Sequence, residues 1–196
     1  ESELAAVDPG IGVEQIAQDR QLEQDVAIKL LTLEDRSEAV ERLLREVRVL
    51  RSVHHPHVVR GFELYEERGQ VGAVMEYITG ETLAQRVKRG PLPDMALLRD
   101  LADVADGLFS LHRMGIVHRD IKPENVILSE LRGAVLVDLG VAKGAARERT
   151  LTQAGSVFSL ERYRAPELVR GVQASAESDV YALACVVLEL ATPNAP

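Results

Sequence analysis

Residues 118–125 read His-Arg-Asp-Ile-Lys-Pro-Glu-Asn, and this stretch decides how the rest of the chain is interpreted. Its eight positions hold a histidine, two cations, two carboxylates and an amide. Polar groups at this density are costly inside a hydrophobic core, so they predict a cleft that binds charged groups. A solvated surface loop is the alternative for an isolated octapeptide of this composition. Motifs elsewhere in the chain decide between the two.

The composition indicates a soluble globular protein. At 196 residues the chain is long enough for one large domain or for two small lobes that share a cleft. It carries 23 Lys and Arg residues against 31 Asp and Glu residues, a formal net charge of -8. This acidic balance argues against a nucleic-acid-binding surface.

Cysteine usage and hydropathy indicate a cellular location. Cys185 is the lone cysteine, which excludes an intramolecular disulfide and fits a reducing compartment. No basic region followed by an apolar run marks a signal peptide at the N-terminus. The longest apolar stretch, residues 180–188, is too short to span a bilayer. We therefore expect a cytoplasmic protein with no membrane span within these residues.

The first part of the chain predicts a strand followed by a helix. Residues 25–31 form an apolar, β-branched run with Lys29 set inside it. A lysine in a strand often extends to solvent, so this residue is informative only if it has a partner. Apolar residues at helical spacing predict a helix over 38–51, with Ser37 as its N-cap. Glu46 lies beside the apolar stripe, and it is an ordinary solvated flank unless a buried cation faces it.

Alternating patterns after this helix predict a β-hairpin, with strands over 62–66 and 71–77. Residues 1–24 are interpreted as irregular, with a glycine-containing turn at 8–13. The histidines within 54–57 raise a metal site as one interpretation. The other is a helix exit with partly buried imidazoles, which the lack of Cys or acidic residues in this cluster favours.

The second part of the chain is rich in helical patterns. Thr82 opens a capping box before a short helix, and apolar residues over 97–112 predict a long helix that ends at Gly115. Short apolar strands follow at 126–128 and 135–137. The change from strands to helices predicts two lobes.

The last two stretches of the chain differ in character. Residues 141–162 lack periodicity and are interpreted as a long surface segment. The final helix, which starts near Ser178, is apolar nearly all round, and this pattern predicts burial on every side.

The order and spacing of the motifs resemble the catalytic domain of eukaryotic-type (Hanks-type) protein serine/threonine kinases, from about residue 10 to residue 196. The matching motifs are Val26-Ala27-Ile28-Lys29, Glu46, His118 to Asn125, Asp138-Leu139-Gly140, Ala165-Pro166-Glu167 and Asp179. Lys122 indicates the serine/threonine kind. The resemblance implies a two-lobed α+β fold, with a small β-rich N-lobe over 1–77 and an incomplete helical C-lobe over 78–196. It implies transfer of the ATP γ-phosphate to Ser or Thr hydroxyls of protein substrates.

Two other functions are compatible with these motifs. A pseudokinase would keep the fold as a nucleotide-binding or scaffolding module and transfer little phosphate. A small-molecule kinase would share the phosphate chemistry, but Ala165-Pro166-Glu167 argues against it.

The resemblance assigns roles to the polar residues, since phosphoryl transfer mainly requires positioning and neutralisation of phosphate oxygens. Asp120 would accept the proton of the substrate hydroxyl, and Lys122 would steady the transferring phosphate. Asn125 and Asp138 would bind Mg²⁺ through oxygen atoms. Lys29 would bind the ATP phosphates, and Glu46 would orient Lys29 through an ion pair.

The resemblance also assigns a nucleotide pocket. Ala27 and Ile127 would sandwich the adenine, with Met75 behind it. The hinge whose backbone hydrogen-bonds the adenine would comprise Glu76, Tyr77 and Ile78. The phosphate-covering loop would use Gly10 and Gly12, while Val7 and Pro9 stand where the family has its first two glycines.

Regulatory and structural roles complete the set of expectations. Arg119 would pair with an anion from the activation segment, which makes Thr150 and Thr152 candidate phosphorylation sites. A plain polar loop is the alternative. Asp179 would tie down the loop at 118–125. The helix over 179–191 would be covered by the family's last helices or by another chain.

Overall fold

The computed structural model describes residues 14–19, 24–30, 36–67, 70–89, 94–139 and 162–191. Contacts between residues divide the chain into two compact units. The first comprises residues 1–54 and 59–78, and the second comprises residues 55–58 and 79–196. The turn expected at 8–13 and most of the surface segment expected at 141–162 lie outside the described residues.

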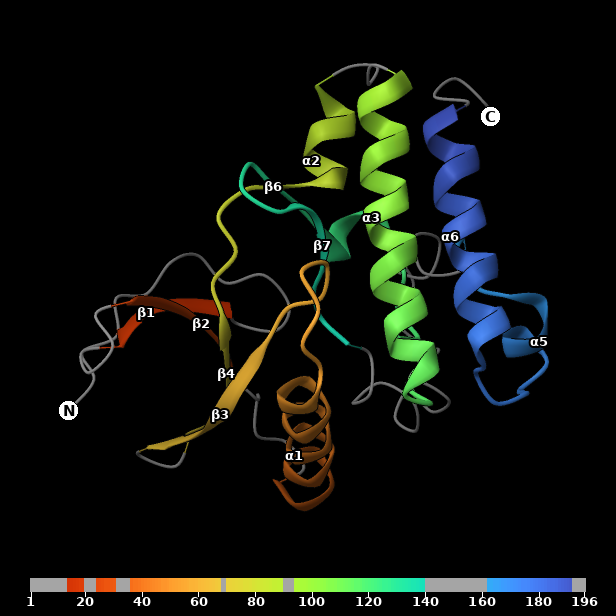
Figure 1. Ribbon diagram of the computed structural model, residues 1–196. Helices are drawn as coiled ribbons and strands as arrows, with labels where there is room; N and C mark the ends of the chain where they lie inside the picture. Colours follow the sequence, from red (N-terminus) through yellow and green to blue (C-terminus); the bar gives the residue numbers. More distant parts are fainter. Residues whose placement is uncertain are drawn as a thin grey trace. The chain divides into compact units, whose positions relative to one another are not determined.

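The first unit contains a four-stranded antiparallel sheet in the order β1-β2-β4-β3 (Figure 1). Its strands are β1 (Glu14–Asp19), β2 (Gln24–Leu30), β3 (Gly61–Glu67) and β4 (Gln70–Glu76). The predictions of β2 and of the β3-β4 hairpin are confirmed. The prediction that residues 1–24 are irregular is wrong for β1, whose two apolar residues are too few to form a recognisable strand pattern. Its pairing with β2 stabilises it instead.

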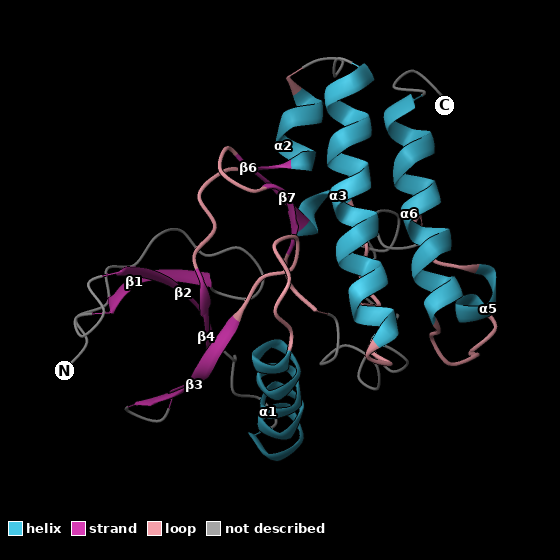
Figure 2. Cartoon of the chain, in the orientation of Figure 1, coloured by secondary structure: helices cyan, strands magenta, loops and turns pink. Residues whose placement is uncertain are grey.

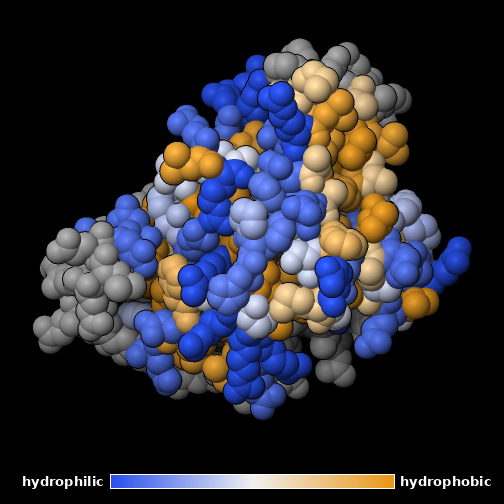
Figure 3. All heavy atoms as spheres, in the orientation of Figure 1, coloured by the Kyte–Doolittle hydropathy of each residue, from blue (hydrophilic) through white to orange (hydrophobic). Residues whose placement is uncertain are grey.

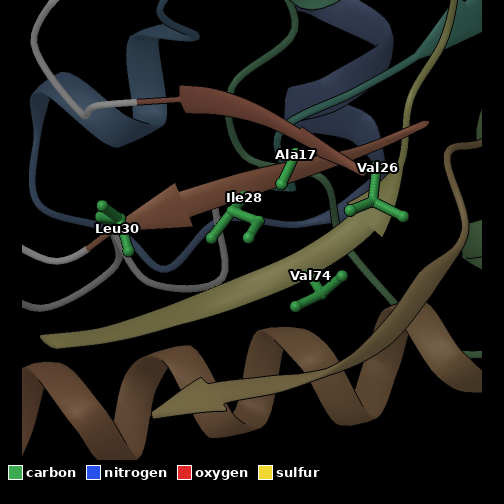
Figure 4. Close-up of a cluster of buried hydrophobic side chains, with 5 residues drawn as sticks. All are labelled: Ala17, Val26, Ile28, Leu30 and Val74. Atoms are coloured by element: carbon green, nitrogen blue, oxygen red, sulfur yellow. The ribbon is translucent and has the colours of Figure 1, made fainter. Parts of the chain in front are cut away.

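One face of this sheet forms a small hydrophobic core (Figure 4). Alternate residues of β2, Val26, Ile28 and Leu30, are buried there with Ala17 and Val74. Because successive side chains of a strand point to opposite faces, Ala27 and Lys29 belong to the other face of β2.

Helix α1 (Arg36–Ser52) belongs to the same unit and packs on β3 and β4. Its apolar stripe is buried, with Leu43 and Leu50 at 1% and 0% exposure. The prediction of Ser37 as the N-cap is wrong, because the helix already includes Arg36. The serine lies in the first turn of the helix rather than before it.

The second unit is mainly helical (Figure 2). Its helices are α2 (Leu83–Lys88), α3 (Asp94–Arg113), α5 (Pro166–Val169) and α6 (Ala176–Ala191). A sheet in the order β5-β6-β7 consists of β5 (Glu81–Thr82), β6 (Val126–Ser129) and β7 (Gly133–Leu136). The 3-10 helix η1 (Pro123–Asn125) precedes β6.

Two predicted helix boundaries in this unit are confirmed. Thr82 and Gln85 form a capping box, in which Gln85 N–H donates to Thr82 Oγ1 at 3.1 Å and Thr82 N–H donates to Gln85 Oε1 at 2.9 Å. Gly115 follows α3 with φ of 73°, a left-handed conformation that suits glycine and ends the helix.

The prediction that the last helix is buried on every side is wrong for this chain. Helix α6 packs on α3, but Val180 and Leu188 are 56% and 63% exposed. Figure 3 shows hydrophobic side chains gathered on the surface that α3 and α6 form. Apolar composition indicates which surfaces of a helix favour burial, but it does not show which other element covers those surfaces. None of the helices in the described part of the chain combines the length and hydrophobicity needed to cross a bilayer.

Candidate functional site

The polar loop, residues 118–125, is held by one buried carboxylate from the first turn of α6. Asp179 is 2% exposed and accepts the N–H of His118 at 2.7 Å and the N–H of Arg119 at 2.8 Å. His112, in the last turn of α3, places Nε2 2.9 Å from the same carboxylate. Arg119 has φ of 69°, a conformation that a non-glycine residue rarely adopts. These bonds stabilise the turn that presents Asp120.

Asp120 is the centre of the loop. Its side chain is buried, and Lys122 Nζ lies 3.3 Å from Oδ2. Asn125 Nδ2 donates to the Asp120 carbonyl and to Oδ2, both at 2.7 Å. A cation and an amide donor on one carboxylate fix its orientation.

Asp138 lies two residues after the end of β7. Val137, the residue before it, donates its N–H to the Asn125 carbonyl at 3.0 Å. Asp138 has φ of 58°, which aspartate tolerates better than most residues. The backbone of Asn125 therefore lies next to that of Val137, the residue that precedes Asp138. Carboxylate and amide oxygens are hard ligands, so this pair suits Mg²⁺.

A cation at this position would need further ligands. Nowhere in the described ranges do three or more His, Cys, Asp or Glu side chains gather as a metal site. This holds for the histidines at 54–57 too: His55 and His57 each face an aspartate of α3, Asp106 and Asp103.

His118, the first residue of the polar loop, has no exposed surface. Burial lowers the pKa of its imidazole, while the carboxylates of Asp179, Asp120 and Asp138 raise it to a smaller extent. The ring is therefore neutral at neutral pH, and Asp120 N–H donates to its Nδ1 at 3.4 Å. A neutral ring adds no positive charge next to the backbone N–H of Asp120.

The residues expected to bind nucleotide lie in both units. In the first unit, Ala27 and Met75 are direct neighbours in the β2-β4 register, and Lys29 in β2 is half-buried. Glu46 belongs to α1, and its side chain lies outside the described part. Ile127 is half-buried in β6 of the second unit.

The three expected hinge residues end β4 and follow it. Glu76 closes the strand and Tyr77 is exposed, while Ile78 is buried at 7% exposure. Glu76 N–H donates to the Arg60 carbonyl at 2.9 Å, which fixes the direction in which the chain leaves the sheet.

The remaining predicted residues divide between the surface and the undescribed segments. The Arg119 side chain is exposed. Gly10, Gly12, Thr150 and Thr152 lie outside the described residues.

Sequence patterns did not indicate three polar side chains that hold the second unit together, namely His112, Tyr163 and Ser178. His112 was assigned to the apolar stripe of its helix, although a histidine on a buried helical face is itself a signal for a polar partner. Tyr163 donates its hydroxyl to Glu189, and its pKa is raised by burial and by that carboxylate. Ser178 Oγ donates to Glu167 Oε1 at 2.8 Å, which ties α6 to α5.

Comparison with known proteins places these features in a wider group. A family model described as the protein kinase domain matches residues 11–196. The chain is 35% identical over 184 residues to the probable serine/threonine-protein kinase pknA2 of Bifidobacterium longum, covering 91% of this chain and 24% of that protein. It is 34% identical over 195 residues to the serine/threonine-protein kinase PknB of Mycobacterium leprae, covering 95% and 31%.

A solved structure supports the same grouping. The crystal structure of the Mycobacterium tuberculosis PknI kinase domain matches with a TM-score of 0.75 and 26% identity, covering 96% of this chain and 71% of that one. This likeness confirms the two-lobed α+β fold expected from the sequence. The chain spans only 24% and 31% of the lengths of the two curated relatives.

Proposed function

We propose that this chain, which belongs to the protein kinase domain family, is the catalytic part of an ATP-dependent protein serine/threonine kinase. The carrying observation is the buried Asp120 carboxylate, held by Lys122 at 3.3 Å and by Asn125 at 2.7 Å. An acid with a fixed orientation supports the proposed role of Asp120 as a proton acceptor. The two curated relatives reported above are both named serine/threonine-protein kinases, and these names support the substrate class.

In the proposed reaction a Ser or Thr hydroxyl of a protein substrate attacks the γ-phosphorus of ATP. The new oxygen–phosphorus bond forms as the bond to the ADP leaving oxygen breaks, and Asp120 takes the hydroxyl proton. Lys122, whose Nζ lies on the same carboxylate, would place its positive charge on the transferring phosphate. Both residues belong to one hydrogen-bonded loop, and such a loop would hold their spacing before substrate binds.

Asn125 and Asp138 would hold Mg²⁺. The amide nitrogen of Asn125 is committed to Asp120, and the amide oxygen is the atom suited to a hard cation. When bound, the ion would neutralise phosphate charge and orient the nucleotide.

The nucleotide roles of the first unit are part of the same proposal. Lys29 would bind the α- and β-phosphates with Glu46 as its orienting partner, and Ala27 and Ile127 would contact the adenine. Met75 would close the adenine pocket, with the hinge over 76–78. The lobes proposed from the sequence are 1–77 and 78–196.

Regulation is proposed at Arg119, whose exposed side chain is free to meet a phosphate from the activation segment. Thr150 and Thr152 are the candidate acceptors, and Gly10 and Gly12 the candidate phosphate-covering glycines. A cytoplasmic location belongs to the proposal because ATP is the phosphate donor.

A transfer assay with radiolabelled ATP tests the proposal on the full-length protein with a basic substrate protein. Asp120→Asn and Lys29→Met should each reduce incorporation by roughly 100-fold or more. Glu130→Gln, an exposed position in the turn between β6 and β7, should transfer like the unmodified protein. Equal incorporation by all proteins would exclude this active site. Thermal stabilisation by ATP and Mg²⁺ without turnover would indicate a pseudokinase instead.

A further inference from the structure

The face of α1 that lies opposite its buried stripe is basic. The buried stripe, with Leu43 and Leu50, packs on β3 and β4. On the opposite side of the helix Arg45, Arg48 and Arg51 are exposed. Residues three apart lie on the same side of a helix, so these three guanidinium groups form one basic stripe along it. Figure 3 shows hydrophilic side chains gathered over this helix.

The helix supplies a carboxylate to the first arginine of the basic stripe. Arg45 Nη2 lies 3.8 Å from Glu41 Oε2, and Arg45 Nε donates to the Glu41 carbonyl at 3.3 Å. For Arg48 and Arg51, the residues three and four positions away in the sequence include no Asp or Glu. Each of them instead has an arginine three residues before it, and like charges at this spacing disfavour a helix. An anion bound along the stripe would remove this repulsion.

A fourth exposed arginine lies near the C-terminal end of α1. Gly61 packs so closely on the last turn that an added Cβ would lie 2.5 Å from Leu50 Cβ and 3.5 Å from the backbone nitrogen of Arg51. Arg60, the preceding residue, is exposed, and its guanidinium lies 5.9 Å from the centre of the Phe62 ring. Positive charge is thus concentrated at this helix in a chain whose net charge is -8.

We propose that the basic stripe, Arg45, Arg48 and Arg51, binds an acidic peptide segment of a partner protein. Guanidinium groups bind carboxylates through paired hydrogen bonds. The stripe extends about 9 Å along the helix axis, a length that a few carboxylates of one peptide would cover. A nucleic acid is a longer polyanion, and exposed Glu63 and Glu66 of β3, on which α1 packs, would repel it. Binding at the stripe does not require the proposed kinase activity.

Fluorescence anisotropy of a labelled octaglutamate peptide, measured with the full-length protein, tests the proposal. The unmodified protein should bind the peptide at about 50 mM salt and release it as the salt concentration rises, because the contacts are ionic. Combined Arg48→Glu and Arg51→Glu should weaken binding by about 10-fold or more. Absence of binding by the unmodified protein would overturn the proposal.

The matched control changes the net charge by the same amount in the second unit. Lys88 and Arg113 are exposed there, in the last turns of α2 and α3. Combined Lys88→Glu and Arg113→Glu should leave the affinity for octaglutamate within about twofold of that of the unmodified protein. An equal loss of affinity in both double variants would mean that the peptide responds to the net charge alone, and this result would overturn the proposal.

The class of anion is tested with an oligothymidylate of the same length as the peptide. At the same salt concentration it should bind several-fold more weakly than octaglutamate. Equal or tighter binding of the oligothymidylate would overturn the assignment to an acidic peptide and indicate a nucleic-acid ligand.

Amide NMR of the unmodified protein locates the peptide even if a charge-reversal variant fails to fold. Addition of octaglutamate should shift the amide signals over 45–52 and leave those of α6 unchanged. Shifts confined to other parts of the chain would overturn the proposal.

Discussion

Two carboxylate–histidine pairs hold backbone groups in the second unit, and they differ in depth. Asp179 is 2% exposed, accepts two backbone N–H groups and lies 2.9 Å from His112 Nε2. Asp103 is 28% exposed, accepts one backbone N–H group and lies 3.5 Å from His57 Nε2. A carboxylate close to a histidine thus holds backbone groups at two places in this unit. A buried pair at hydrogen-bond distance fixes the polar loop, whereas a looser and more exposed pair holds one backbone group of β7.

The largest expected effect separates the two aspartates directly. Asp179→Asn retains one acceptor oxygen but turns an amide N–H₂ toward a second buried backbone donor. We expect it to lower the free energy of unfolding by about 3 kcal/mol and phosphate transfer by roughly 100-fold. Asp103→Asn, at the more exposed pair, should cost about 1 kcal/mol. Urea denaturation and the transfer assay measure both variants. Equal losses of stability would contradict the difference in depth.

The sequence predicted the Asp179 anchor but neither histidine partner. Asp179 was found because it occupies a family motif, and its expected role is the one that its hydrogen bonds have. His112 and His57 depend on pairings that are distant in the chain, between α3 and α6 and between the segment over 55–58 and β7. Local patterns carry no information on such pairings. His57 was instead considered as one of three clustered imidazoles.

A second, intermediate effect concerns the glycine beside the Asp103 pair. Gly133 has φ of 72°, and a Cβ added there would overlap Asp103 Oδ2. Gly133→Ala should lower the free energy of unfolding by about 2 kcal/mol. One part of this loss comes from the left-handed backbone conformation, and the other comes from displacement of the Asp103 carboxylate. Gly171 is a matched control, because its φ is 77° and an added Cβ would meet nothing within 4 Å.

Gly171→Ala should therefore cost about 1 kcal/mol, from the backbone alone. Thermal unfolding of both variants measures the difference. If both alanine variants lose the same free energy of unfolding, the Asp103 carboxylate is not held rigidly at this position. The contrast between Asp103 and the buried Asp179 would then be larger.

Most of the fold followed from local patterns, and the exceptions have physical causes. The capping box at Thr82 and the left-handed Gly115 involve neighbouring residues, so the sequence specifies them directly. β1 was missed because its stability comes from pairing with β2. The burial predicted for α6 was wrong, since Leu188 is 63% exposed. Hydrophobic side chains favour burial, but the sequence of the helix does not show which part of a protein would cover them.

The smallest expected effect lies next to the Asp103 pair. The pKa of Asp100 is raised by burial and then by the Asp103 charge, with Arg86 opposing. A raised carboxyl pKa means that the folded state binds more protons than the unfolded state above the ordinary value of 3.8. Stability therefore falls as pH rises through this range toward neutrality.

Asp100→Asn removes this penalty. At neutral pH it should stabilise the protein slightly, within about 0.5 kcal/mol, and the gain should shrink as pH approaches about 4. The gain should also be smaller in an Asp103→Asn background, because that substitution removes the second cause of the shift. Tm measured across this pH range checks both trends, with Glu130→Gln as the exposed control. A loss of stability at neutral pH, or a gain independent of pH, would mean that burial and the Asp103 charge do not disfavour the ionised form of Asp100.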